Sequence, residues 1–148
     1  MGTRSAIGYK TPEGKIRAKY SHYDGYPAYT GVMLQTHYQE ARKIAQMVEL
    51  GDQSFLAENI FPKGEHSFEK PEDNCTIFYG RDRGETDVDA HDFETVQEFV
   101  DYYKECGCEY FYLHTSTGWI VNHHSDTNSQ GWPIFDMLEL RVEGLDHA

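Results

Sequence analysis

Two parts of the sequence place histidine close to aspartate. They are His22 with Asp24, and His123 and His124 with Asp126. A histidine can transfer protons in catalysis, or bind a divalent metal through one ring nitrogen while a carboxylate orients the other. If the two pairs converged in the fold, they would suit a small metal-dependent hydrolase. The chain has 8 histidines among many carboxylates, so local hydrogen bonding within loops is the simpler interpretation.

Cysteines offer a second, weaker candidate for a metal site. Cys106 and Cys108 form a C-x-C pair, and His114 follows in the next segment. Zinc sites usually show C-x-x-C spacing and four ligands, whereas this sequence holds 3 cysteines in all. We therefore favour two reduced cysteines that fill a turn between a helix and a strand, and expect no metal.

Two arginines flank Asp82 in a short segment between glycines. Two guanidinium groups on a flexible turn suit a phosphate or carboxylate ligand, and tyrosine rings could stack on a nucleotide base. The alternative is that these arginines pair with their acidic neighbours. A nucleotide-binding or signalling-molecule pocket would be lined by Arg4, His22, Asp24, Tyr26, Arg81 and Arg83.

A concentration of negative charge is the largest chemical feature of the sequence. Between Asp82 and Glu109 there are ten carboxylates and two basic residues. A row of carboxylates at helical spacing can imitate the phosphates of DNA toward a basic protein, and such binding weakens with salt. The alternative is a solvated face that aids solubility. The row consists of Glu94, Glu98, Asp101 and Glu105.

Common catalytic motifs are missing from the sequence. It contains no G-x-x-x-x-G-K-[ST], G-x-G-x-x-G, G-x-S-x-G or H-E-x-x-H pattern. These patterns mark most nucleotide hydrolases, dinucleotide enzymes, serine hydrolases and metalloproteases. A protein without enzymatic activity or cofactor is therefore favoured.

Length and charge limit the remaining classes. The 148 residues are enough for a single domain over 1–148. The net charge of −12 disfavours direct binding to nucleic acid or to an anionic membrane. No apolar run reaches the length of a membrane span, and the first ten residues do not resemble a signal peptide, so we expect a cytosolic protein.

The first part of the chain predicts a hairpin followed by a long helix. Residues 5–9 are expected to form a short strand, and residues 15–20 alternate polar and apolar side chains, as a half-buried strand does. Apolar residues at steps of three and four indicate a helix over 31–50, with Thr30 as its N-cap and Gly51 beyond its end. Shorter segments are a loop at 22–29, a cap and short helical turn at 52–56, a surface loop at 62–74, a strand at 75–79 and a charged turn at 80–85.

The second part predicts another helix and another hairpin. Residues 92–105 have an apolar stripe at helical spacing, formed by Phe93, Val96, Val100 and Tyr103. Residues 109–114 and 119–123 form the hairpin. The last segment, 135–140, is predicted as a strand, with a helix as the alternative. Two helices among about five or six short strands indicate the α+β class, with a largely antiparallel sheet and both helices packed on one face.

Several short motifs together resemble a known group of proteins. They are the opening MGTRSAIG (1–8), HYDGYP (22–27), Gly31 with His37 and Tyr38, and YGRDRGE (79–85). On these motifs the chain resembles a family of small, mostly uncharacterised proteins of tailed bacteriophages, and the similarity covers most of its length. Tyr23 stands where many relatives have Trp. The family supplies no catalytic residue, and the resemblance implies a phage accessory protein in the bacterial host cytoplasm.

Three functions follow from these patterns, and the first is favoured. It is a phage-type accessory protein that inhibits or redirects a host protein with a basic surface, in defence or nucleic-acid handling, through its acidic face. The second is a small-ligand binder that sequesters a nucleotide or signalling molecule. The third is the small metal-dependent hydrolase.

Overall fold

The computed structural model describes residues 2–125, 131–134 and 137. Its strands are β1 (Ser5–Lys10), β2 (Ile16–Ser21), β3 (Gln53–Phe55), β4 (Ile77–Phe78), β5 (His91–Phe93), β6 (Tyr110–Thr115), β7 (Gly118–His123) and β8 (Trp132–Pro133). Its helices are the π-helical turn η1 (Pro27–Gly31), α1 (Val32–His37), α2 (Ala41–Glu49), α3 (Tyr79–Arg83) and α4 (Val96–Glu105).

The strands form one sheet in the order β4-β3-β2-β1-β6-β7-β8. β5 pairs with the first half of β2, whereas β3 pairs with its last residue, Ser21. Most pairs are antiparallel, but β1 with β6 and β2 with β3 are parallel. The predicted mixed fold with a largely antiparallel sheet is confirmed. The predicted number of strands was too low, because the 8-stranded sheet includes very short strands.

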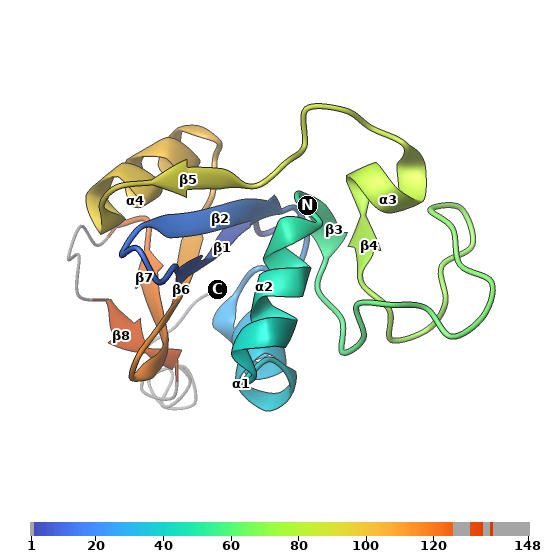
Figure 1. Cartoon of the computed structure of the whole chain (residues 1–148), viewed down its shortest axis with the longest axis horizontal. Coiled ribbons are helices and arrows are strands. Elements are labelled where there is room, and N and C mark those ends of the chain that lie inside the picture. Colours follow the sequence, from blue (N-terminus) through green and yellow to red (C-terminus); the bar gives the residue numbers. More distant parts are fainter. Residues whose placement is uncertain (1, 126–130, 135–136, 138–148) are drawn as a thin grey trace.

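Helices cover both faces of the sheet, so the prediction that they share one face is wrong. Adjacent residues of a strand point to opposite faces. Ile7 of β1 belongs to the core cluster that contains residues of α1 and α2, while its neighbour Ala6 belongs to the cluster that contains α4. Figure 1 shows α4 above the β1–β2 pair and α1 and α2 below it.

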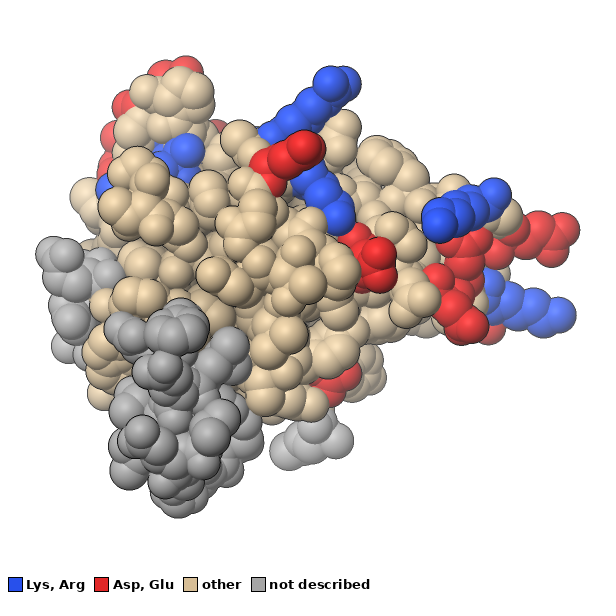
Figure 2. Space-filling view, turned by 90° about the horizontal axis from the view of Figure 1, so that it is seen from below, with Lys and Arg blue, Asp and Glu red and all other residues tan. Residues whose placement is uncertain are grey.

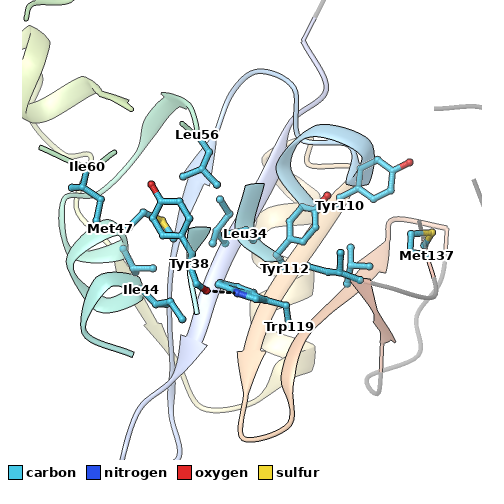
Figure 3. Close-up of a cluster of buried hydrophobic side chains, with 14 of the residues drawn as sticks. Leu34, Tyr38, Ile44, Met47, Leu56, Ile60, Tyr110, Tyr112, Trp119 and Met137 are labelled. Atoms are coloured by element: carbon cyan, nitrogen blue, oxygen red, sulfur yellow. Dashed lines mark hydrogen bonds between the residues drawn. The ribbon is translucent and has the colours of Figure 1, made fainter. Parts of the chain in front are cut away.

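The larger core lies between the sheet and the α1–α2 segment. Leu34, Tyr38, Ile44 and Met47 come from this segment and are fully buried (Figure 3). The indole Nε1 of Trp119 on β7 donates a hydrogen bond to the Tyr38 carbonyl at 2.8 Å. Burial of these side chains therefore joins the helical segment to the second hairpin.

The helix predicted over 31–50 is interrupted at Tyr38, so this prediction is wrong in its extent. Tyr38 has φ −126° and ψ 68°, and its hydroxyl donates to the Ala57 carbonyl at 2.5 Å. Thr30 is not an N-cap, because it lies within η1 and its hydroxyl donates to the Asp24 carbonyl at 2.7 Å. Contacts with distant segments thus outweigh the local preference for one continuous helix. Within the described part of the chain, no helix has the length and hydropathy needed to cross a membrane.

Three shorter segments also differ from the sequence predictions. The expected helical turn at 52–56 contains β3, because the chain pairs with β2 and β4. The expected turn at 80–85 is largely the short helix α3, which ends at the left-handed Gly84 (φ 77°). The first residues of the helix predicted at 92–105 form β5, and α4 begins after its N-cap Thr95, whose hydroxyl accepts from the Glu98 amide.

The final predicted strand, residues 135–140, lies outside the described residues apart from Met137. The Met137 side chain is buried in the larger core cluster. The side chain of Phe99 on α4 is also buried, although the predicted stripe omitted it.

The side chain of Lys19, at the centre of the sheet, is fully buried although it can carry a charge. Its ammonium group donates to the Met47 carbonyl at 2.6 Å and to Gln53 Oε1, and it lies 4.4 Å from the centre of the Phe78 ring. Burial lowers the Lys19 pKa well below its ordinary value. Its neighbour Tyr20 points to the other face of β2, toward α4.

Candidate functional site

A small pocket lies where α4 meets the end of β2. It has a volume of about 250 Å³ and is lined by Tyr20, Asp52, His91, Tyr102, Tyr103 and Cys106. We call it the Tyr102 pocket. These residues come from β2, the turn before β3, β5 and the C-terminal half of α4 with its cap. Segments far apart in sequence therefore combine aromatic rings, a carboxylate, an imidazole and a thiol.

A close backbone approach brings the walls of this pocket together. Gly51 has φ +81°, and a Cβ added there would lie 2.2 Å from the Val88 carbonyl oxygen. The next residue, Asp52, donates its amide to the same carbonyl at 2.8 Å. Only glycine fits this conformation and spacing, and the approach fixes the 88–91 segment beside Asp52.

Asp52 is the acidic group of the Tyr102 pocket. Its Oδ1 accepts the Tyr20 backbone amide at 3.0 Å, and no described residue donates to Oδ2. Burial raises the Asp52 pKa, although the Tyr20 amide, His91 and Lys19 act in the opposite direction. The carboxylate is thus partly desolvated and retains an unused acceptor oxygen.

Tyrosine side chains form most of the remaining lining. The Tyr102 hydroxyl lies 3.3 Å from His91 Nε2, and the two rings are 5.1 Å apart. Tyr103 packs edge-on against Tyr102, and its buried hydroxyl has no hydrogen-bond partner among the described residues. Tyr20 donates to or accepts from His22 Nδ1 at 2.7 Å, and burial raises the Tyr20 pKa to about 12.

The chemistry of the Tyr102 pocket favours binding over nucleophilic attack. Burial raises the pKa of the Cys106 thiol, and the neighbouring Asp52 and Glu105 raise it further. The thiol is therefore protonated at neutral pH and is a poor nucleophile. Aromatic faces beside a carboxylate attract cations and hydrogen-bond donors instead.

The acidic row of the sequence lies next to this pocket. Glu98, Asp101 and Glu105 are exposed on α4, and their spacing of three and four residues places them on one helix face. Tyr102 lies at i+4 from Glu98 and therefore belongs to that face. Glu94 does not lie on the helix as predicted, because it precedes the N-cap Thr95.

Local contacts occupy half of the predicted acidic row. Glu94 pairs with Lys15 at 3.3 Å. Glu98 Oε1 accepts the Glu94 amide at 3.0 Å, so this carboxylate helps to cap the helix. Asp101 accepts only from the neutral Gln97 amide at 2.9 Å, and neither Asp101 nor Glu105 forms an ion pair with a described residue.

The two arginines of the predicted ligand pocket make intramolecular contacts on α3. Arg81 donates to the Ile60 and Thr76 carbonyls at 2.6 and 3.2 Å and forms an ion pair with Asp82 at 2.8 Å. Arg83 stacks on Phe68 at 4.7 Å and pairs with Glu85 at 3.2 Å. At this end of the molecule, on the right of Figure 2, basic and acidic side chains lie side by side.

The other predicted ligand-binding residues lie near the end of the sheet where β1 begins and β2 ends. Arg4 and His22 flank the paired strand residues Ser5 and Ser21, and burial and the charge of Arg4 lower the His22 pKa. Asp24 is exposed, and no hydrogen bond or ion pair joins it to His22. Tyr26 packs against the larger core cluster. The structure thus groups Arg4 with His22 but places Arg81 and Arg83 on another element, and the nucleotide hypothesis stays a prediction.

The residues suggested for metal sites are spread along the sheet. His22 follows Ser21, and the register Ser21–Ser5–Tyr110–His123 separates it from His123 by three strand spacings, about 14 Å. Cys108 precedes β6 and His114 lies near its end, about 20 Å away. In the described part of the chain, no three His, Cys, Asp or Glu residues are arranged to hold a metal ion. Asp126 lies outside that part.

Of the residues that line the Tyr102 pocket, only Cys106 was a candidate for chemistry from the sequence, and Tyr103 was predicted only as part of a buried helix stripe. Asp52 resembled a helix cap, and Tyr20 resembled an ordinary strand residue. The available signal was Tyr102, a large aromatic residue within a row of exposed carboxylates. Comparison of the chain with known protein families, curated proteins and solved structures found no match.

Proposed function

We propose that this chain is a binding protein that recognises a basic surface on another protein through the exposed face of α4. The observation that carries the proposal is the pair Asp101 and Glu105, which are exposed and form no ion pair with any described residue. Charged groups without a local partner can attract the cations of another molecule. This two-residue contact replaces the four-residue row expected from the sequence.

The physical basis of the proposed binding is electrostatic attraction between the acidic chain and a basic partner. The chain carries a net charge of −12, so long-range attraction steers a basic partner toward it. Bound counterions are released from both surfaces on association, and the affinity therefore falls as salt rises. The capping contacts of Glu98 and Thr95 stabilise the start of α4, the helix that carries Asp101 and Glu105.

The partner is a bacterial host protein of the kind a phage would inhibit or redirect, in defence or in nucleic-acid handling. The support for this part is the resemblance of the MGTRSAI, HYDGYP and YGRDRGE motifs to small phage proteins. A host protein that binds nucleic acid has a basic surface, which is the complement that Asp101 and Glu105 require.

The test is capture of proteins from a bacterial lysate on the immobilised chain. Capture is compared at about 50 mM and about 200 mM salt and analysed by mass spectrometry. The test variant is Asp101→Lys with Glu105→Lys. The control is Glu69→Lys with Asp73→Lys, which makes the same change in net charge on exposed residues of the 62–74 loop.

The proposal expects basic proteins that bind at low salt, are lost at high salt, and are lost from the α4 variant but not from the loop control. Equal loss from both variants would show that only total charge matters. Capture that neither variant changes would show that α4 is not the contact surface. Either of these results contradicts the proposal.

A further inference from the structure

We infer that the Tyr102 pocket receives an arginine side chain of the protein partner, as the anchor of the contact made by α4. This inference rests on the proposed function and adds the part of the partner that enters the fold.

The size of the pocket fits one side chain and not a nucleotide. Sites for drug-sized ligands usually measure about 300–1,000 Å³, and the Tyr102 pocket measures about 250 Å³. The arginines that were expected to hold phosphate, Arg81 and Arg83, do not line it. A single extended side chain is the occupant that matches this volume.

The walls of the pocket suit a planar cation. Tyr20, Tyr102, Tyr103 and His91 supply four rings around the space. A guanidinium group stacks on aromatic faces and is weakly hydrated, so it enters such a site more readily than an ammonium group. The rings therefore favour arginine over lysine.

Unused polar atoms provide acceptors for guanidinium N–H groups. No described residue donates to Asp52 Oδ2. The Tyr103 side chain lines the pocket, and its buried hydroxyl has no hydrogen-bond partner among the described residues. An unpaired buried hydroxyl is costly, so a donor that reached it would gain more than a donor at an exposed site.

No lysine or arginine of the described residues lines this pocket. Lys19 lies on the opposite face of β2 and donates to Met47 and Gln53. Arg4 is the charged group that acts most strongly on Tyr20, but its guanidinium lies against Gly107 and does not line the pocket. The carboxylate of Asp52 thus remains available to a partner.

The pocket opens on the helix face proposed as the contact. Tyr102 lines the pocket and is 42% exposed, and it lies between Asp101 and Glu105 along α4. A basic segment drawn to these carboxylates would pass over the mouth of the pocket. Buried aromatic contacts with arginine are frequent anchors at protein interfaces.

The test uses two peptides of nearly the same shape, one with a charged guanidinium group and one with a neutral ureido group. Acetyl-Gly-Arg-Gly-amide is titrated into the ¹⁵N-labelled chain, and acetyl-Gly-citrulline-Gly-amide is the neutral isostere. The arginine peptide is expected to cause saturable shifts of the amides of residues 20, 52, 91 and 102. The citrulline peptide is expected to bind with at least tenfold lower affinity. Spermidine is the third ligand, because a free polyamine is the other source of a small cation.

Two variants separate the pocket from general charge. Asp52→Asn keeps an oxygen for the Tyr20 amide but removes the charge. It is expected to lower the affinity for the arginine peptide at least fivefold. Asp73→Asn, the matched control at an exposed position of the 62–74 loop, is expected to weaken binding of the peptide less than twofold. The amide spectra of the variants show directly whether each is folded. Tyr102→Leu is a second pocket variant, and its affinity for the arginine peptide is expected to fall at least threefold.

Absence of saturable shifts, equal binding of the citrulline peptide, or equal effects of Asp52→Asn and Asp73→Asn would overturn the inference. Tighter binding of spermidine than of the peptide would also overturn it, because the pocket would then be a polyamine site. If the arginine peptide does not bind but proteins are still captured from the lysate through α4, only the inference about the pocket is overturned and the proposed function stands. Binding of the arginine peptide without capture by α4 would remove the proposed function instead.

Discussion

The carboxylate of Asp52 accepts the backbone amide of Tyr20 at 3.0 Å, and so connects the turn before β3 to the end of β2. One oxygen of Asp52 makes this connection, and no described residue donates to the other. Burial raises the pKa of this carboxyl, so the charged form costs the folded state some stability. A group kept at such a cost is typical of a binding site.

Replacing Asp52 by Asn is expected to leave the protein as stable as before or more stable at neutral pH. The folded-state pKa is raised, so the contribution of Asp52 to stability is fully present below its unfolded pKa, about 4, and is lost as the pH rises through the folded pKa. The melting temperatures of the wild type and of Asp52→Asn, measured from about pH 4 to about pH 8, should therefore be equal at the lowest pH. At neutral pH the variant should melt up to about 3 °C higher. Asp73→Asn is the exposed control, and a less stable Asp52→Asn at neutral pH would contradict this account.

Lys19 is expected to be essential for stability although it carries no proposed role in binding. Lys19→Ala would leave a cavity and two acceptors, the Met47 carbonyl and Gln53 Oε1, without their donor. We expect a loss of about 3 kcal/mol or more in the free energy of unfolding, measured by denaturant titration. Lys10→Ala, at an exposed position on the adjacent strand, should change it by less than about 0.5 kcal/mol. Similar values for the two variants would show that Lys19 is not buried as described.

The two tryptophans offer a matched test of the larger core. Trp119 is 3% exposed and donates to the Tyr38 carbonyl at 2.8 Å, whereas Trp132 is 36% exposed. Trp119→Phe is expected to lower the free energy of unfolding by about 1–3 kcal/mol, because it removes a buried hydrogen bond and part of the ring. Trp132→Phe should have an effect within about 0.5 kcal/mol. The reverse order would disprove the connection between β7 and the interruption of the helical segment at Tyr38.

Arg81 is expected to stabilise the fold, and Arg83 is expected to contribute little. Arg81→Ala removes the donor to the Ile60 and Thr76 carbonyls and leaves Asp82 with fewer partners, which should cost about 2 kcal/mol or more. Arg83→Ala removes an exposed ion pair and should cost less than about 1 kcal/mol. Thermal shifts with a panel of nucleotides test the alternative at the same time. A nucleotide that stabilises the wild type but neither variant would support the ligand-binding hypothesis for this segment.

Local patterns in the sequence predicted those elements that depend on neighbouring residues. The hairpins β1–β2 and β6–β7 were predicted correctly, because alternation and a short turn decide such pairs. The second helix was also predicted, although its first residues pair with β2 as β5 instead. Chain segments that pair over long distances leave no comparable local signal.

Long-range contacts explain the main errors. β1 and β6 pair in parallel although they lie about a hundred residues apart in the sequence, and no local pattern predicts this pairing. Tyr38 interrupts a helical pattern because its hydroxyl and its carbonyl both bond to distant residues. The Tyr102 pocket was missed for the same reason, since Tyr20, Asp52, His91 and Tyr102 come from four separate segments.

Asp101 and Glu105 on α4, which form no ion pair with a described residue, are proposed as the contact with a basic protein partner. The most direct test of this claim is the dissociation constant of a captured and purified partner, measured against salt concentration for the wild type and for Asp101→Lys with Glu105→Lys. We predict that log affinity falls linearly with log salt for the wild type, and that the variant binds at least about tenfold more weakly with a shallower slope. A dissociation constant that depends neither on salt nor on these two residues would contradict the claim.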